Sequence, residues 1–255
     1  MTETTAKKFG ISSFVLHIAA MLFMLCDHVW AILLFDVTPL AYIGRIAFPI
    51  FAFMLAEGFF HTKNHKKYLL RMLIFAVISE IPFNLLVGGG VFYLTHQNVL
   101  WTFSIALCAM LLLKQLKNRS LVVRCICYPL IVLIAFLVGF VTFVDYFGYG
   151  VITVLLFYFT YTTRKDSLIK RLIMMLIQLA VIIIINCEML GGVSFPFELF
   201  GYTFDFPTQY TAVLALPIIW LYNGAQGPYN KFIKYLYYSF YPLHMLILAI
   251  VAMFM

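Results

Sequence analysis

The feature that most constrains this chain is a series of long apolar runs separated by short polar loops. A bilayer-spanning helix needs about 20 mostly apolar residues, and nine runs approach that length. Of all residues 64% are hydrophobic and 11% charged, whereas a soluble domain is about half apolar and a quarter charged. We therefore expect an all-α, polytopic integral membrane helical bundle of about nine transmembrane helices, forming one domain over residues 1–255. The runs are 12–34, 42–60, 68–87, 98–113, 125–143, 148–163, 172–187, 208–222 and 235–254.

The loops between these runs alternate in charge. Because basic loops stay in the cytoplasm, the alternation predicts a cytoplasmic N-terminus and an outer C-terminus in a multi-pass protein of a bacterial cytoplasmic membrane. The first run is too long for the apolar part of a cleavable signal peptide. The basic loops contain Lys7, Lys8, Lys63, Lys66, Lys67, Lys114, Lys117, Arg119, Arg124, Arg164, Lys165, Lys170, Arg171, Lys231 and Lys234. The acidic loops contain Asp36, Asp145, Glu188, Glu198 and Asp205.

The net charge of +7 follows from these loops. The basic residues sit beside membrane spans rather than along one groove, so we expect no nucleic-acid partner. The longest outer segment, residues 188–207, is aromatic and acidic, and it is either re-entrant or interfacial. The five cysteines are scattered through apolar runs, a distribution that indicates neither a disulfide framework nor a metal site.

Seven ionisable residues fall inside the predicted spans. A charged group at the bilayer centre costs about 2.5 to 3.5 kcal/mol on insertion scales, so such residues indicate a functional site by default. The alternative is structural pairing, in which the arginine balances a carboxylate and the histidines satisfy helix contacts. The seven are His17, Asp27, His28, Arg45, Glu57, Glu80 and His244.

Helix geometry separates the groups on the first span. His17 and His28 are eleven residues apart, which places them on one face at a distance of about 16 Å. Asp27 is turned by about 100° from His28 and is therefore expected to face a neighbouring helix, where it would pair with Arg45 or another polar group. We also expect Asp27, His28, Arg45, Glu80 and His244 to converge around one polar cavity, because none of them would face lipid.

Several motifs carry a family resemblance over nearly the whole chain. They are MLCDH at 24–28, IGRIAFPIFAFMLAEGFFHTKNHKKYLLRMLIFAVISEIPFN at 43–84, NVLWTFSIAL at 98–107, VDYFGYGV at 144–151, ALPIIWLYNG at 215–224 and KYLYYSFYPLHMLIL at 234–248. In this order they closely resemble the TraX family, integral membrane proteins named for the N-terminal acetylation of conjugative pilin. TraX proteins in turn look like distant members of a broader group of transmembrane acyltransferases.

The resemblance implies that an acyl group passes from cytoplasmic acyl-CoA to an acceptor across the membrane. His28 falls at the position of the group's catalytic histidine, and His17 stands where that group has an arginine. Asp27 with His28 matches the family's Asp-His pair, and Arg45 belongs to its Gly-Arg. Five further motif positions are Glu57, His61, Glu80 and, in Tyr-Pro-Leu-His, Tyr241 and His244.

Acyl transfer needs a base, donors for the oxyanion and a binding site for the coenzyme. Histidine suits the first role because its pKa lies near the working pH, and we expect His28 to be the base, with His244 as its competitor. Arg45, Asn98 or a backbone amide would bind the oxyanion. The phosphates of acetyl-CoA would meet Lys66, Lys67 and Arg71 or the loop 114–124, although plain positive-inside topology also explains these cations.

Two other classes of function stay open at this point. A secondary transporter would use the Asp, Glu and His groups as a proton relay, and it predicts internal repeats that the sequence does not display. A scaffold for a surface structure would neither bind acyl-CoA nor depend on His28. The acceptor, whether a peptide amine, a glycan or a small molecule, is not readable from the sequence.

Overall fold

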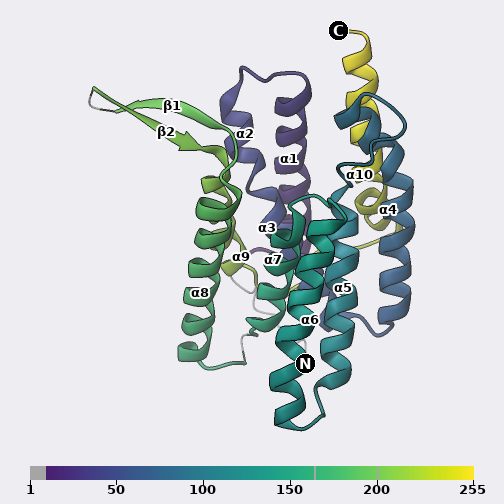
Figure 1. Cartoon of the computed structure of the whole chain (residues 1–255), viewed down its shortest axis with the longest axis vertical. Coiled ribbons are helices and arrows are strands. Elements are labelled where there is room, and N and C mark those ends of the chain that lie inside the picture. The colour runs from purple at the N-terminus through teal and green to yellow at the C-terminus, as the bar shows by residue number, and fades with distance from the viewer. Residues whose placement is uncertain (1–9, 164, 200) are drawn as a thin grey trace, which may run out of the picture.

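The computed structural model describes residues 10–163, 165–199 and 201–255, which form a bundle of helices with one small hairpin (Figure 1). The α-helices are α1 Ser13–Ile32, α2 Thr38–Gly44, α3 Ala47–His61, α4 His65–Gly88, α5 Val99–Leu116, α6 Leu121–Val141, α7 Phe147–Phe159, α8 Leu168–Ile183, α9 Ala215–Trp220 and α10 Lys231–Met253. The remaining elements are the π-helix η1 Ile184–Leu190, the strands β1 Ser194–Leu199 and β2 Tyr202–Pro207, and the 3-10 helix η2 Thr208–Leu214.

Each of the nine predicted apolar runs is helical, which confirms the all-α membrane bundle. Within the described residues, seven helices are long and apolar enough to cross a bilayer, and α2 with α3 counts as one of them. The segments Phe147–Phe159 and Thr208–Trp220 are shorter. A helix of 13 residues such as α7 spans about 20 Å, less than the 30 Å hydrocarbon core, so these two segments depend on their neighbours to complete a crossing.

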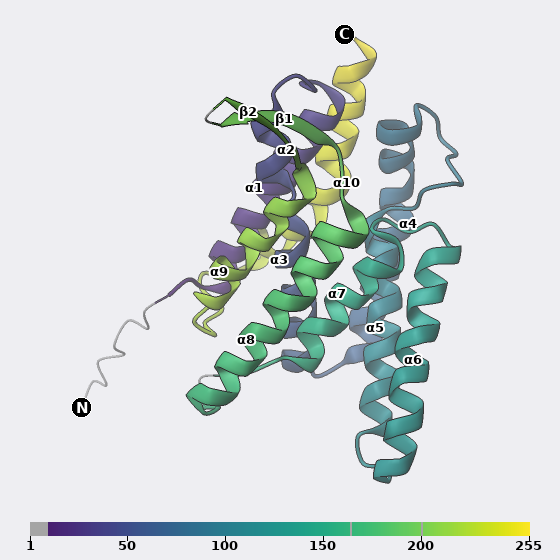
Figure 2. The same ribbon diagram turned by 60° about the vertical axis from the view of Figure 1, so that its left-hand side comes forward.

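The helices run up and down between two chemically different ends (Figure 2). One, which we call the basic end, contains the α3–α4, α5–α6, α7–α8 and α9–α10 loops with their lysines and arginines, and α1 starts there. Ser13 N donates to Ala225 O over 2.8 Å and so ties that start to the α9–α10 loop. The other end, which we call the hairpin end, carries β1, β2 and the end of α10. This separation agrees with the predicted orientation.

Side-chain caps fix where several helices begin. Ser12, Asn64, Ser120 and Asn230 each accept a hydrogen bond from a backbone N–H in the first turn of the helix that follows. Such a cap satisfies a donor that has no partner within the helix. All four lie at the basic end, so the sequence itself marks where the chain re-enters the bundle.

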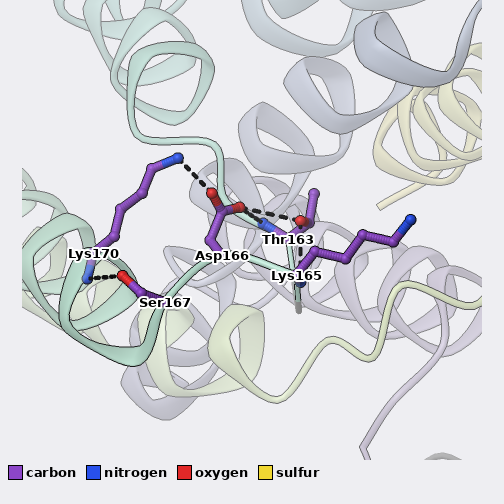
Figure 3. A network of polar contacts seen from close by, with 5 residues as sticks. All are labelled: Thr163, Lys165, Asp166, Ser167 and Lys170. Atoms are coloured by element: carbon purple, nitrogen blue, oxygen red, sulfur yellow. Dashed lines mark hydrogen bonds and ion pairs between the residues drawn. The ribbon is translucent and has the colours of Figure 1, made fainter.

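A network of polar contacts also stabilises the α7–α8 loop (Figure 3). Asp166 accepts from Thr163 N at 2.7 Å and from Lys170 Nζ at 2.5 Å. Ser167 Oγ caps α8 by accepting from Lys170 N. The hydrogen bond from Lys170 is the main reason that the pKa of Asp166 falls to about 2. The ammonium group of Lys170 is therefore paired with Asp166 within this loop.

The centre of the bundle is formed by α3, α5 and α7, while α6 and α8 are peripheral. Ile50, Leu107 and Val151 are almost fully buried. By contrast, only 6% of the residues in the most apolar stretch of α6 are buried. The value is 17% for the span Leu168–Leu190, in which η1 continues α8. The apolar side chains that these two helices expose are suited to lipid, which would cover them in a membrane.

Residues 188–207, the segment expected to be re-entrant or interfacial, end in an antiparallel hairpin instead of re-entering the bundle (Figure 1). Phe195 pairs with Phe206 in its ladder. Tyr42 Oη donates to Phe206 O over 2.8 Å, and the Tyr42 ring lies 6.2 Å from that of Phe195. The base of the hairpin is thus attached to α2, beside the outer end of α1.

Candidate functional site

Two adjoining cavities lie inside the bundle. The larger, about 670 Å³, lies toward the basic end, and the smaller, about 50 Å³, lies deeper. Five residues line both cavities: Met24, Phe51, Val99, Phe103 and Tyr241. Because they share these walls, the two cavities are neighbours, and these five side chains lie between them.

The large cavity combines aromatic walls with a few charged groups. His17 Nδ1 donates to Ser13 O over 2.8 Å, and the His17 ring stacks on Tyr237 with centroids 4.3 Å apart. Glu57 Oε1 accepts from Tyr222 Oη at 2.6 Å and lies 3.2 Å from His61 Nε2. The other charged residues on its wall are Arg71 and Lys234.

The small pocket is bordered by an ion pair between α1 and the α2–α3 junction. Arg45 Nε lies 3.3 Å from Asp27 Oδ1, which confirms the predicted pairing, and these side chains are 20% and 17% exposed. A Cβ at Gly44 would lie 2.5 Å from the Asp27 Cβ, so glycine permits this close approach. The Arg45 guanidinium also sits 5.6 Å from the centre of the Trp30 ring.

His28 and His244 meet beside this pocket across 216 residues of sequence. His28 Nδ1 lies 2.7 Å from His244 Nε2, and the two rings are nearly parallel. His244 Nδ1 in turn lies 2.7 Å from Phe240 O. His28 lines the small pocket, whereas His244 is 6% exposed behind it. His17 and His28, which lie on one face of α1, therefore both face α10, since His17 stacks on Tyr237 and His28 contacts His244.

Asp145 enters the same small pocket from the α6–α7 loop. Its Oδ1 accepts from Tyr146 N at 3.1 Å and lies 3.3 Å from His96 Nε2. Phe143, Tyr146 and Phe147 have φ values of 53°, 60° and 48°, a left-handed conformation that is costly for side chains of this size. The strained loop thus holds the carboxylate of Asp145 against the pocket.

Comparison with known proteins places the chain in a family. The family model described as "TraX protein" matches residues 12–252. The chain belongs to the TraX family. It is also 31% identical to the probable fimbrial assembly protein FimC, serogroup H1, of Dichelobacter nodosus over 180 residues, which is 66% of this chain and 70% of that protein. No solved structure matches the chain significantly.

Most of the residues predicted from the TraX motifs line the two cavities. His17, Glu57, His61, Arg71 and Tyr241 line the large one, and Asp27, His28 and Tyr241 line the small one. Arg45 and His244 are bonded to Asp27 and His28. The motifs that are distant in sequence therefore meet along one path from the basic end to His28.

Glu80 and Asn98, by contrast, form a separate cluster with Trp101. Asn98 Nδ2 and Trp101 Nε1 both donate to Glu80 Oε2. Asn98 Nδ2 also donates to Ala76 O, and Asn98 Oδ1 accepts from Leu100 N. Neither residue lines either of these two cavities, so these contacts favour a structural role over the catalytic and coenzyme-binding roles expected for them.

Lys66 and Lys67 are exposed in the first turn of α4 and likewise do not line either cavity. Sequence reasoning missed Asp145, Tyr146 and Tyr222, which line the path instead. The TraX motifs VDYFGYGV and ALPIIWLYNG contain all three residues. The loop charge pattern identifies Asp145 only as one of the acidic loop residues. Its carboxylate within the VDYFGYGV motif is the signal that could have placed it in the site.

Proposed function

We propose that this TraX family member is an acetyl-CoA-dependent acyltransferase in which His28 is the general base. The observation that carries the proposal is the succession of two adjoining cavities, one toward the basic end and one lined by His28, which is paired with His244. A large cavity at the positively charged end suits a phosphorylated donor, and a small pocket at its inner end suits the reacting acetyl group.

The hydrogen bonds of the two histidines indicate which one is the base. A carbonyl oxygen cannot donate, so Nδ1 of His244 must carry the hydrogen that is shared with Phe240 O. In the neutral ring, Nε2 of His244 then accepts, and Nδ1 of His28 donates to it. This leaves the lone pair on Nε2 of His28, an atom that makes no hydrogen bond within the described residues.

In the proposed step, the acceptor nitrogen or oxygen attacks the thioester carbonyl carbon as Nε2 of His28 takes its proton. The new N–C or O–C bond forms and the C–S bond breaks. His28 then returns the proton to the sulfur, so that free CoA leaves as the thiol. His244 holds the His28 ring in the productive tautomer, because its own Nδ1 is anchored to Phe240 O.

The surrounding charges have complementary roles in this proposal. Asp27 holds Arg45 beside the small pocket, where the remaining guanidinium N–H groups are donors for a developing oxyanion. Asp145 reaches the pocket from the other side and would attract a positively charged acceptor. The acceptor is an amine or a hydroxyl, and a pilin-like peptide amino terminus is the first candidate because the family is named for pilin and a relative is described as a fimbrial assembly protein.

We also place the protein in a bacterial cytoplasmic membrane, with the basic end in the cytoplasm. Acetyl-CoA would then enter from the side on which it is made, and the acceptor would arrive at or beyond the membrane.

Calorimetric titration of purified protein with acetyl-CoA tests the donor, and release of the CoA thiol tests transfer. A short peptide with a free amino terminus serves as the acceptor probe, and the same peptide with a blocked amino terminus is the control. We expect saturable binding and thiol release with the free peptide. Folded protein that does not bind acetyl-CoA at millimolar concentration would contradict the enzyme proposal and leave the transporter and scaffold alternatives.

A further inference from the structure

The large cavity contains two buried polar atoms that the protein does not satisfy. Arg71 Nε and Tyr237 Oη are shielded from solvent and have no hydrogen-bond partner in the described residues. Both residues line the cavity. A buried donor without a partner costs about 1–3 kcal/mol, and more when it is charged, so two such donors on residues that line one cavity indicate an anionic or acceptor-rich ligand.

These two residues sit at one level of the bundle. Arg71 is six residues into α4 and Tyr237 is six residues into α10, so each lies about 9 Å from the start of its helix at the basic end. The two helices pack together at this level, where the rings of Phe75 and Tyr238 stack with centroids 5.0 Å apart. His17 stacks on Tyr237 and holds its ring at the wall of the cavity.

The charges facing this part of the cavity are Arg71, Lys234 and Glu57. The Glu57 carboxylate is bonded to Tyr222 and His61 on the side of the α9–α10 loop. Arg71 forms no ion pair within the described residues, and Lys234 lies one turn closer to the basic end than Tyr237 on the same helix. The α4–α10 side of the cavity is therefore positive and unpaired.

We propose that Arg71 and Tyr237 form the subsite for the diphosphate of CoA. The distance from this subsite to His28 then matches the length of the pantetheine arm. This inference rests on the proposed function. An arginine fork suits phosphate oxygens, and the tyrosine hydroxyl adds a neutral donor beside it.

The depth of the subsite agrees with the length of the arm. From the level of His17 to His28 is about 16 Å along α1, and from Tyr237 to His244 is about 10 Å along α10. The pantetheine chain is as long as the backbone of about four residues, which reaches about 14 Å when extended. A diphosphate held between Arg71 and Tyr237 therefore places the thioester beside His28, with the nucleotide toward the basic end.

Calorimetric titration of the full-length protein with three probes tests the subsite. CoA carries both parts of the ligand, ADP carries the diphosphate without the arm, and pantetheine carries the arm without phosphate. We expect Arg71→Met to weaken CoA and ADP binding about 10- to 100-fold and to leave pantetheine unchanged. We expect Tyr237→Phe to weaken CoA about 3- to 10-fold, and Arg71→Lys to fall between Arg71→Met and wild type.

Arg124→Met is the matched control, since Arg124 Nε is also buried without a partner but does not line either cavity. It should bind all three probes as wild type does. If Arg71→Met binds CoA within about twofold of wild type, or loses pantetheine as strongly as CoA, the subsite is wrong while the acyltransferase proposal stands. If folded wild type binds neither CoA nor ADP, both proposals fail. Should Arg71→Met not fold, Arg71→Lys and Tyr237→Phe decide by the same criterion.

Discussion

Two polar clusters inside the membrane look alike in sequence and differ in structure. The histidine cluster consists of Asp27, His28, Arg45 and His244, and the Glu80 cluster consists of Glu80, Asn98 and Trp101. The histidine cluster borders the small pocket and leaves Nε2 of His28 without a partner. In the Glu80 cluster, two donors converge on one carboxylate oxygen away from both cavities. Glu80 Oε1 is also buried without a partner in the described residues, so intramembrane charge with an unpaired atom does not by itself mark a candidate site. In our proposal the adjoining cavity distinguishes the histidine cluster.

The largest expected effect separates the clusters by chemistry. His28→Ala should lower acetyl transfer about 10²- to 10⁴-fold, the usual cost of removing a general base. Acetyl-CoA affinity should stay near the wild-type value, because our proposal places most of the coenzyme in the large cavity. Rates measured with saturating acetyl-CoA, together with calorimetric binding, check both points. If His244→Ala is inactive while His28→Ala turns over normally, the base has been assigned to the wrong histidine.

Asp27→Asn should lower both stability and activity. Removing one partner of a fully buried ion pair costs about 3–5 kcal/mol, and the partial exposure of Asp27 and Arg45 places this variant near the lower bound. Arg45 would keep its contact with the Trp30 ring but lose its counter-charge. Folded yield and thermal unfolding in detergent measure the stability. Wild-type stability and turnover together would show that the pair does not position the α2–α3 junction.

Glu80→Ala should destabilise the protein by about 1–3 kcal/mol, because Trp101 Nε1 would lose its acceptor and Asn98 Nδ2 would keep only Ala76 O. Transfer per folded molecule should change little. Unfolding temperature and rate, normalised to folded protein, are the readouts. A stable but inactive variant would show that Glu80 takes part in the reaction and does not only stabilise the bundle.

The smallest expected effect lies in the outer loop, where the hydrogen bond to Asp145 is the main reason that the pKa of His96 is raised. A pKa that is higher in the folded state adds stability below the unfolded value of about 6.5, and this stability is lost as the pH rises through the folded value. Because His96 and Asp145 are 37% and 31% exposed, the gain should stay below about 1 kcal/mol. Wild type should therefore unfold at a higher temperature than His96→Gln at pH 5.5 and at nearly the same temperature at pH 8. An equal difference at both pH values would show that the pair does not titrate in this range.

The sequence predicted the helices and one contact, but not the meeting of distant segments. Nine apolar runs become helices because the backbone in lipid must satisfy its own hydrogen bonds. The Asp27–Arg45 pair followed from helix geometry over a short stretch of chain. The His28–His244 bond joins residues 216 positions apart, and Asp145 reaches the pocket through a strained loop. Both depend on how the helices pack, which local periodicity does not specify.

The hairpin was also beyond sequence reasoning. Residues 194–207 alternate aromatic and polar side chains, but an isolated two-stranded hairpin is marginal in water. Its base is held by Tyr42 and by the packing of Phe195 against Trp30 and Phe35. Those contacts come from α1 and the segment that follows it, so the strands could not be predicted from their own residues.

The central claim is that acyl transfer occurs at the histidine cluster while the Glu80 cluster only stabilises the bundle. Measuring acetyl transfer and unfolding temperature of purified His28→Ala and Glu80→Ala in one experiment tests it most directly. The account predicts opposite results: His28→Ala unfolds near the wild-type temperature without transferring acetyl groups, and Glu80→Ala unfolds earlier but transfers at nearly the wild-type rate when folded. Activity retained in His28→Ala and lost in folded Glu80→Ala would contradict the claim.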